Sequence, residues 1–309
     1  MLADNFSRLK TNLELTQSFD DLVQQRHNAV RSYIENQHVN VVDTKLIGSI
    51  KRKTRIQPTP NSPFDIDVLV IMGSFYNWLP VGSPNGITAD QALGELHRTM
   101  KTSDRYAAMS PQVEPPTISI QYADKTLVEF VPAYIDQIGS SPDGAPHNPV
   151  GRAYWIPKNG KWELADYDYE ANYITEKNLA SDGWLIPTIK MLKAIKRIYF
   201  PQMRSFHLDI IATAIIPISV ASNKQYGIQS SYPKLIADFF TYAPLHLTLP
   251  AKIPGSHSPA ISLNSAEALA LTDTFQKIKA YIDSFAAAPQ EYKQIEGWGM
   301  LFGDVFPNT

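Results

Sequence analysis

Two carboxylates stand one residue apart in the segment "PFDIDVLV", at Asp65 and Asp67. The Val, Leu and Ile residues around them predict a buried strand over residues 65–72. Because side chains alternate along a strand, both acids point to one face, while Phe64 and Ile66 point to the other face, into a core. Two carboxylates this close repel each other unless a positive charge lies between them. A hard divalent cation such as Mg²⁺, which prefers oxygen ligands, would supply that charge.

A third acid, Glu129, is the isolated charge of the apolar segment "TLVEFVPAY", which predicts a strand over residues 126–134. A charge in such a strand is costly unless it is paired or bound to a metal. If this strand pairs beside the strand of Asp65 and Asp67, three carboxylates converge, which is enough for a two-metal phosphoryl-transfer site. Taken singly, an Asp-x-Asp pair is a common solvent-facing strand end, and a lone Glu is a common edge-strand charge.

A Gly-Ser pair, Gly48 and Ser49, precedes the acids across a basic stretch that contains prolines, "IKRKTRIQPTPNS". Glycine lets the backbone approach a phosphate, and the serine hydroxyl and exposed amides can donate hydrogen bonds to it. The pair alone is a weak signal because it is common in long chains. Together with the acids it predicts the phosphate end of the same site.

The elements that must position these residues change character along the chain. The first half predicts helices over residues 18–37 and 88–101, the second with a capping box at Thr88 and Gln91. Its predicted strands cover residues 39–42, 65–72, 117–122 and 126–134. Residues 139–168, rich in Pro, Gly, Asn and aromatics, predict a long ordered connection. The helices predicted after it cover residues 182–199, 206–221 (interrupted by Pro217), 232–241 and 264–287.

This order predicts an α+β fold with two lobes and an active site in the cleft between them. The first lobe is predicted over residues 1–155, with a mixed sheet and an N-terminal helix that braces the lobes. The second, helical lobe is predicted over residues 156–309. A chain of 309 residues fits two units of roughly 150 residues each.

The composition excludes several classes of protein. The net charge of −2 argues against a stable nucleic-acid partner, and the absence of cysteine excludes disulfides and thiolate metal sites. No apolar run reaches about 18 residues, so no membrane span is expected. The N-terminus lacks the apolar core of a signal peptide, and a cytoplasmic location is predicted.

The three-part motif "LIGSIKRKT…FDIDVLV…LVEFVPAY" resembles that of the polymerase-β-like nucleotidyltransferases, and specifically of the bacterial CD-NTases. These are relatives of cyclic GMP-AMP synthase and oligoadenylate synthase. The resemblance continues into the helical half, where "IPTIKMLKAIKRIYF" and "RSFHLDIIA" are similar to family segments. Two features differ from the commonest family pattern: the longer spacing between Gly-Ser and Asp65, and Glu129 in place of Asp.

The resemblance implies roles for individual residues. Asp65 and Asp67 would bind two Mg²⁺ ions, or Mn²⁺ in their place, and Glu129 would bind the ion nearer the attacking hydroxyl. The remaining implied contacts are to the donor nucleotide: its phosphates would meet Gly48, Ser49, Lys193 and Ser205, and its base would stack on Phe206.

Helical geometry provides a partly independent test of these roles. Lys190, Lys193 and Arg197 fall on one face of the helix predicted over residues 182–199, which suits a triphosphate clamp or, equally, a solvated face. On its own, Phe206 is more typical of a core residue. Trp162 and the tyrosines of the predicted connection could stack on an acceptor base or pack the loop: Tyr167, Tyr169 and Tyr173.

The resemblance implies an enzyme that joins nucleoside triphosphates into a cyclic di- or trinucleotide second messenger and releases pyrophosphate. The product would act on a downstream effector in anti-phage (CBASS) signalling. Three alternatives stay open at this point. The chain could be a non-cyclising nucleotidyltransferase acting on RNA or protein, a nucleotide-binding pseudoenzyme, or a structural α/β protein with an accidental Asp-x-Asp pair.

Overall fold

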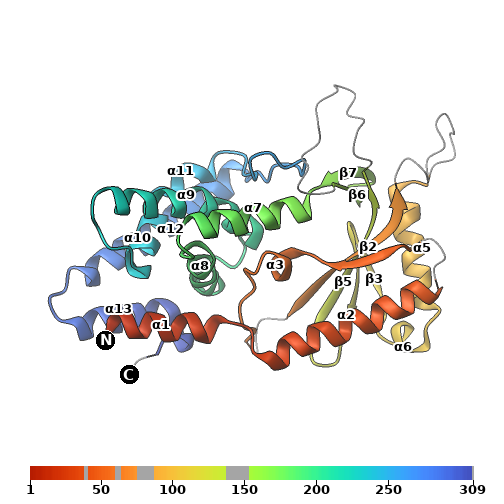
Figure 1. The fold of residues 1–309 in the computed structure, drawn as a ribbon, viewed down its shortest axis with the longest axis horizontal. Coiled ribbons are helices and arrows are strands. Elements are labelled where there is room, and N and C mark those ends of the chain that lie inside the picture. Colours follow the sequence, from red (N-terminus) through yellow and green to blue (C-terminus); the bar gives the residue numbers. More distant parts are fainter. Residues whose placement is uncertain (38–40, 60–63, 75–86, 137–152, 308–309) are drawn as a thin grey trace.

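The computed structural model describes residues 1–37, 41–59, 64–74, 87–136 and 153–307. Figure 1 shows an elongated molecule with a sheet and its covering helices at one end and a group of helices at the other. This mixed-sheet and helical arrangement confirms the predicted α+β class.

A single seven-stranded sheet forms the first part of the molecule, in the order β1-β2-β5-β4-β3, with β6 pairing β5 and β7 pairing β6. Strands β2 and β5 are parallel, and the other strand pairs among the described residues are antiparallel. The strands cover Asp43–Leu46 (β1), Asp65–Ser74 (β2), Gln112–Glu114 (β3), Thr117–Gln121 (β4), Leu127–Ile135 (β5), Tyr154–Lys158 (β6) and Lys161–Ala165 (β7).

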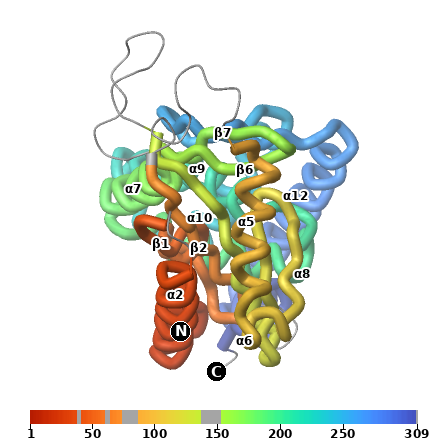
Figure 2. Tube along the Cα trace, turned by 90° about the vertical axis from the view of Figure 1, so that its right-hand side faces the viewer, coloured from red at the N-terminus to blue at the C-terminus, as the bar shows by residue number. Residues whose placement is uncertain are grey.

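Helices α2 (Gln17–Gln37) and α5 (Ala89–Lys101) pack against the sheet (Figure 2). The core there contains Ile66, Val68 and Val70 of β2, which alternate with the acids as predicted. Both capping-box bonds of Thr88 and Gln91 form at the start of α5. The short helix α6 (Asp104–Ala107) follows α5. The face of β2 that bears Asp65 and Asp67 is therefore the face opposite α2 and α5.

Two predictions for the first half are wrong. The sequence predicts a strand over residues 39–42, but the strand that pairs with β2 is β1, at Asp43–Leu46. Residues 39 and 40 lie outside the described residues. The connection predicted over residues 139–168 contains the β6–β7 hairpin, and its first fourteen residues, 139–152, lie outside the described residues. Asn159 and Gly160 at the hairpin tip have φ of 52° and 72°. An Asn-Gly pair with positive φ is the standard signal for a two-residue hairpin turn.

The second part of the molecule is helical, and its core is rich in aromatic rings such as Phe200, Phe239 and Phe275. Its helices cover Tyr167–Ala180 (α7), Leu185–Tyr199 (α8), Ser205–Gln225 (α9), Tyr232–Tyr242 (α10), Pro244–Leu247 (α11), Ser265–Ala286 (α12) and Glu291–Phe302 (α13), followed by a 3₁₀ turn at Gly303–Val305 (η1). Helices α7, α11 and α13 are absent from the sequence prediction. Helix α9 continues through Pro217, because packing against α8 and α10 offsets the lost backbone bond.

The N-terminal region bridges the two parts. Helix α1 (Leu2–Leu13) packs on α8 and α13, whereas α2 packs on the sheet (Figure 1). The division at residues 155 and 156 stays a prediction; it falls inside β6, which the hydrogen bonding assigns to the sheet. By length and composition, α9 is apolar enough to cross a membrane, but 61% of its most apolar window is buried, as in the core helix of a water-soluble protein.

Candidate active site

The three predicted carboxylates come from adjacent strands. Strands β2 and β5 run parallel, and their register places Asp67 directly beside Glu129. The two side chains are hydrogen-bonded to each other. Asp65 lies two residues earlier on the same face of β2, beside Leu127 of β5. The prediction that the two strands pair is therefore confirmed, and Asp67 is the central acid of the set.

Burial and mutual repulsion perturb two of these acids. Burial raises the pKa of Asp67 above its usual range, against the lowering effect of the Arg52 guanidinium. Burial and the adjacent Asp67 charge raise the pKa of Glu129 to about 7. Two acids that share a proton are the expected state of a metal-binding carboxylate pair when no cation is bound.

Glu129→Gln is expected to change how stability depends on pH. The folded-state pKa of Glu129 exceeds its ordinary value of 4.5, so the folded protein binds this proton more tightly than the unfolded chain does. The free energy of unfolding therefore falls as pH rises from about 4.5 to about 7. Gln does not titrate, so the variant gains stability relative to the wild type across this window. Urea unfolding in EDTA buffer at several pH values measures this; a constant stability difference from pH 4.5 to 7 would contradict it.

Gly48 brings the backbone of the Gly-Ser segment against the central acid. It begins the short helix α3 (Gly48–Lys51) with φ of 65°, and a Cβ there would lie 1.9 Å from Asp67 Oδ2. The Ile47 amide donates to the Asp67 carbonyl at 2.9 Å, which ties the loop to β2. Only glycine fits a position that combines left-handed backbone with this close approach. The predicted Gly-Ser turn is thus the first turn of a helix, and Ser49 lies in it.

A cleft of about 350 Å³ lies beside the acids. Its lining includes two acids, Asp65 and Asp67, and two hydroxyl side chains, Ser49 and Ser205. Cations outnumber the acids in this lining: Arg52, Arg55, Lys193, Lys196 and Arg197. A concave surface with excess positive charge and exposed hydroxyls suits a polyphosphate. Arg52, Arg55 and Lys196 are not among the site residues predicted from the sequence. The sequence signals that could have indicated these three residues are the basic stretch after Gly48 and the helical spacing from Lys193 to Lys196. Only the tertiary structure shows which of these cations face the cleft.

The residues predicted to contact the phosphates and the base do not all line the cleft. Lys193 lines the cleft, and burial lowers its pKa to about 8. Lys190 is not among the cleft residues: it is buried and forms an ion pair with Glu14 at the end of α1. The Phe206 ring is partly buried against the helical core, and the Arg52 guanidinium carbon lies 4.3 Å from its centroid. The base-stacking role of Phe206 stays a prediction.

The aromatic side chains of the predicted connection have mainly structural contacts. Trp162 donates from its indole nitrogen to the Ile87 carbonyl at 3.2 Å and packs edge-on against Tyr134. The Tyr169 hydroxyl donates to the Pro254 carbonyl at 2.8 Å. Tyr167, at the start of α7, is close enough to Asp67 for the carboxylate charge to contribute to its raised pKa, after burial and Glu170.

The donor set fits a hard divalent cation in its chemistry. Two of the acids already have polar partners: the Arg55 guanidinium lies 3.6 Å from Asp65, and Asp67 shares a hydrogen bond with Glu129. Within residues 1–37, 41–59, 64–74, 87–136 and 153–307, no three His, Asp or Glu side chains form a preassembled metal site. A divalent cation bound at this face would take the place of the Arg55 guanidinium and of the proton shared by Asp67 and Glu129, and the carboxylate oxygens would coordinate it.

Comparison with known proteins places this chain in a family. Residues 1–178, from α1 to the last turn of α7, match the domain model described as Second Messenger Oligonucleotide or Dinucleotide Synthetase. The chain belongs to this family of synthetases. The synthetase is thus a nucleotidyltransferase, and the resemblance to the bacterial CD-NTases is confirmed. None of the curated protein sequences matches it.

Solved structures share the fold of this synthetase over nearly its full length. CdnC of E. coli MS115-1, in a complex with HORMA-deltaN, has a TM-score of 0.67 at 14% identity, covering 99% of this chain and 98% of its own. The CD-NTase CdnG of Bradyrhizobium diazoefficiens, solved with GTP, has a TM-score of 0.67 at 11% identity, covering 98% and 96%. The CdnE c-UMP-AMP synthase of Rhodothermus marinus, solved with Apcpp and Upnpp, has a TM-score of 0.65 at 12% identity, covering 93% and 97%.

Proposed function

We propose that this synthetase joins nucleoside triphosphates into a cyclic di- or trinucleotide and releases pyrophosphate. The observation that supports it most is the juxtaposition of Asp67 and Glu129 with a cleft whose walls carry an excess of cations. We further propose that the product is a second messenger for a downstream effector in anti-phage signalling, and that the protein acts in the cytoplasm.

One group of residues would bind the donor triphosphate, and the three carboxylates would bind the metal ions. The donor triphosphate lies along Ser49, Lys193 and Ser205, which line the same cleft. Asp65, Asp67 and Glu129 would hold two Mg²⁺ or Mn²⁺ ions, which when bound neutralise charge on the attacking and leaving oxygens. Most of the barrier reduction then comes from positioning and charge stabilisation.

Each transfer balances as one bond formed and one broken. A ribose hydroxyl of the acceptor forms an O–P bond to the donor's α-phosphorus, and the bond from that phosphorus to the bridging oxygen breaks, which releases pyrophosphate. The hydroxyl proton passes to a carboxylate of the site, such as Glu129. A second transfer within the linear intermediate closes the ring.

A product assay tests this function. The purified protein is incubated with the four ribonucleoside triphosphates and Mg²⁺ or Mn²⁺, and the mixture is then treated with phosphatase. We expect a phosphatase-resistant nucleotide product, absent from the Asp65→Ala/Asp67→Ala variant. Nucleotide binding without any product in either metal would contradict the proposal and indicate a binding protein. Labelling of added RNA or protein instead would indicate a non-cyclising transferase.

A further inference from the structure

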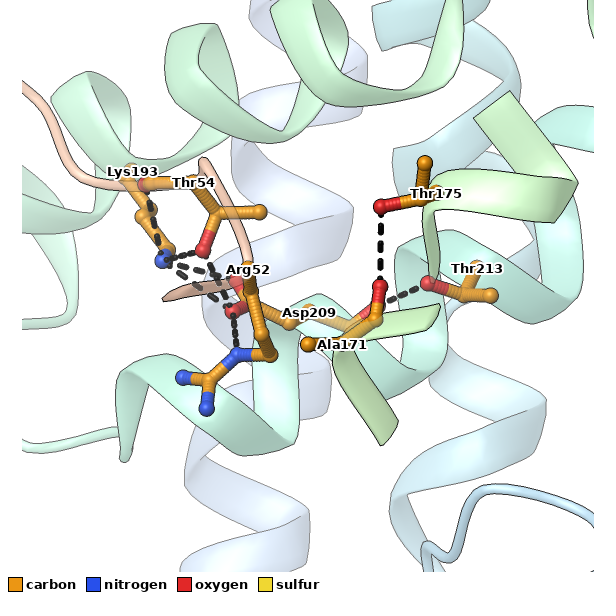
Figure 3. Close-up of polar contacts among 7 residues, drawn as sticks. All are labelled: Arg52, Thr54, Ala171, Thr175, Lys193, Asp209 and Thr213. Carbon is orange, nitrogen blue, oxygen red and sulfur yellow. Dashed lines mark hydrogen bonds and ion pairs between the residues drawn. The ribbon is translucent and has the colours of Figure 1, made fainter. Parts of the chain in front are cut away.

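A buried carboxylate behind the cleft binds two of its cations at once. Asp209, near the start of α9, has no solvent-exposed surface. Lys193 of α8 places its Nζ 2.9 Å from Asp209 Oδ1 and 3.1 Å from Oδ2. Arg52, which follows α3, donates from Nε to Asp209 Oδ2 at 3.2 Å. Figure 3 shows both cations converging on this one side chain.

Thr54 closes the network from the loop side. Its hydroxyl donates to Asp209 Oδ2 at 2.9 Å, and Lys193 Nζ donates to the hydroxyl and carbonyl oxygens of Thr54 at 2.9 and 3.0 Å. The Lys193 ammonium, with three protons to donate, thus has partners in Asp209 and in both oxygens of Thr54. Arg52 and Thr54 come from the loop that begins at Gly48, whereas Lys193 and Asp209 come from α8 and α9, so the network joins the two parts of the molecule.

The arrangement has a consequence for the shape of the cleft. Arg52 and Lys193 line the cleft together with Arg55, and these like charges repel one another. Asp209 offsets the repulsion between Arg52 and Lys193, and it does so from behind, since it is not among the residues that line the cleft. The hydrogen bond from Arg52 Nε to Asp209 also orients the Arg52 guanidinium, which lies over the Phe206 ring.

We infer that Asp209 is a positioning residue for polyphosphate binding: it fixes Arg52 and Lys193 side by side on the cleft wall, and Arg52 is a further phosphate-binding residue. The inference rests on the proposed function, because it takes the triphosphate of a nucleotide as the ligand. Asp209 itself does not contact the ligand.

Binding of inorganic tripolyphosphate tests this inference without any assumption about the base. Isothermal titration in EDTA compares the wild type with Asp209→Asn, which keeps the side-chain shape and removes its charge. We expect at least tenfold weaker binding, because Arg52 and Lys193 lose their shared counter-charge. The matched control is Thr213→Val, a buried substitution one turn along α9; the Thr213 hydroxyl donates to the Asp209 backbone carbonyl and not to its carboxylate. It should bind within twofold of the wild type.

A double-mutant cycle separates positioning from a general structural effect. In an Arg52→Met background, Asp209→Asn should weaken tripolyphosphate binding by a clearly smaller factor, because one of the two cations that Asp209 orients is gone. If Asp209→Asn does not fold, Thr54→Val, which removes two hydrogen bonds from the network without burying a lone charge, should weaken binding by two- to fivefold.

The outcomes that contradict the inference differ from those that contradict the proposed function. Equal binding by wild type and Asp209→Asn, or equal factors with and without Arg52, would overturn the inference alone. If Thr54→Val is the variant used, unchanged affinity would overturn it. Failure of the wild-type protein to bind either tripolyphosphate or a nucleoside triphosphate would overturn the proposed function and this inference with it.

Discussion

Asp67→Asn is expected to lower the rate of product formation by at least roughly 10³-fold, or ~4 kcal/mol of transition-state stabilisation, without unfolding the protein. Asp67 is the central acid, beside Glu129 and on the same face as Asp65, so its loss removes a charge that both neighbours need to bind cations. Because burial raises its pKa, the ionised form is disfavoured in the folded state, and the neutral amide should keep or raise the melting temperature near pH 7.

The matched control for this prediction is Asp124→Asn, at the turn between β4 and β5, which is not among the cleft residues. The hydrogen bond from Arg26, at 2.6 Å, lowers the pKa of Asp124, so its charge is favoured in the folded state. Asp124→Asn should therefore keep full activity and lose a little stability, the reverse of Asp67→Asn. Product assays and thermal unfolding of both variants measure the contrast. More than a tenth of wild-type activity in Asp67→Asn would show that this carboxylate is dispensable.

Gly48→Ala is expected to lower both activity and stability. The backbone at φ of 65° would hold an alanine in the left-handed region, which costs roughly 1–2 kcal/mol. Its Cβ would also lie 1.9 Å from Asp67 Oδ2, so the carboxylate or the loop must move. Since misplacement of about 1 Å can cost on the order of 10²-fold in rate, we expect a loss of that size.

Gly227→Ala isolates the backbone contribution. Gly227 has nearly the same φ, 66°, but nothing lies within 4 Å of its would-be Cβ. This variant should lose roughly 1 kcal/mol of stability and keep its activity. Chemical denaturation and product assays on both glycine variants give the comparison. Equal stability losses, with activity retained in Gly48→Ala, would mean that the close approach to Asp67 is easily relieved.

The parts of the fold that the sequence predicts are those with local signals. Alternation in β2 predicts which side chains face the core, and the side chains of Thr88 and Gln91 mark the start of α5. The β6–β7 hairpin also has a local signal, Asn159-Gly160, which the aromatic and proline-rich surroundings obscured. Helix α7 has apolar and polar residues mixed around its circumference, so no periodic pattern indicates it.

The sequence by itself determined the chemistry available to this protein: two acids on one strand face, a third in an apolar strand, and a Gly-Ser pair ahead of them. Only the tertiary structure decided which charges meet. Arg52 and Asp209 are 157 residues apart in the chain, yet they share a hydrogen bond. The physical reason is that periodicity and capping act over a few residues, whereas strand register and helix packing bring distant side chains together. Lys190 and Lys193 lie on one helix face, but packing pairs the first with Glu14 and places the second in the cleft.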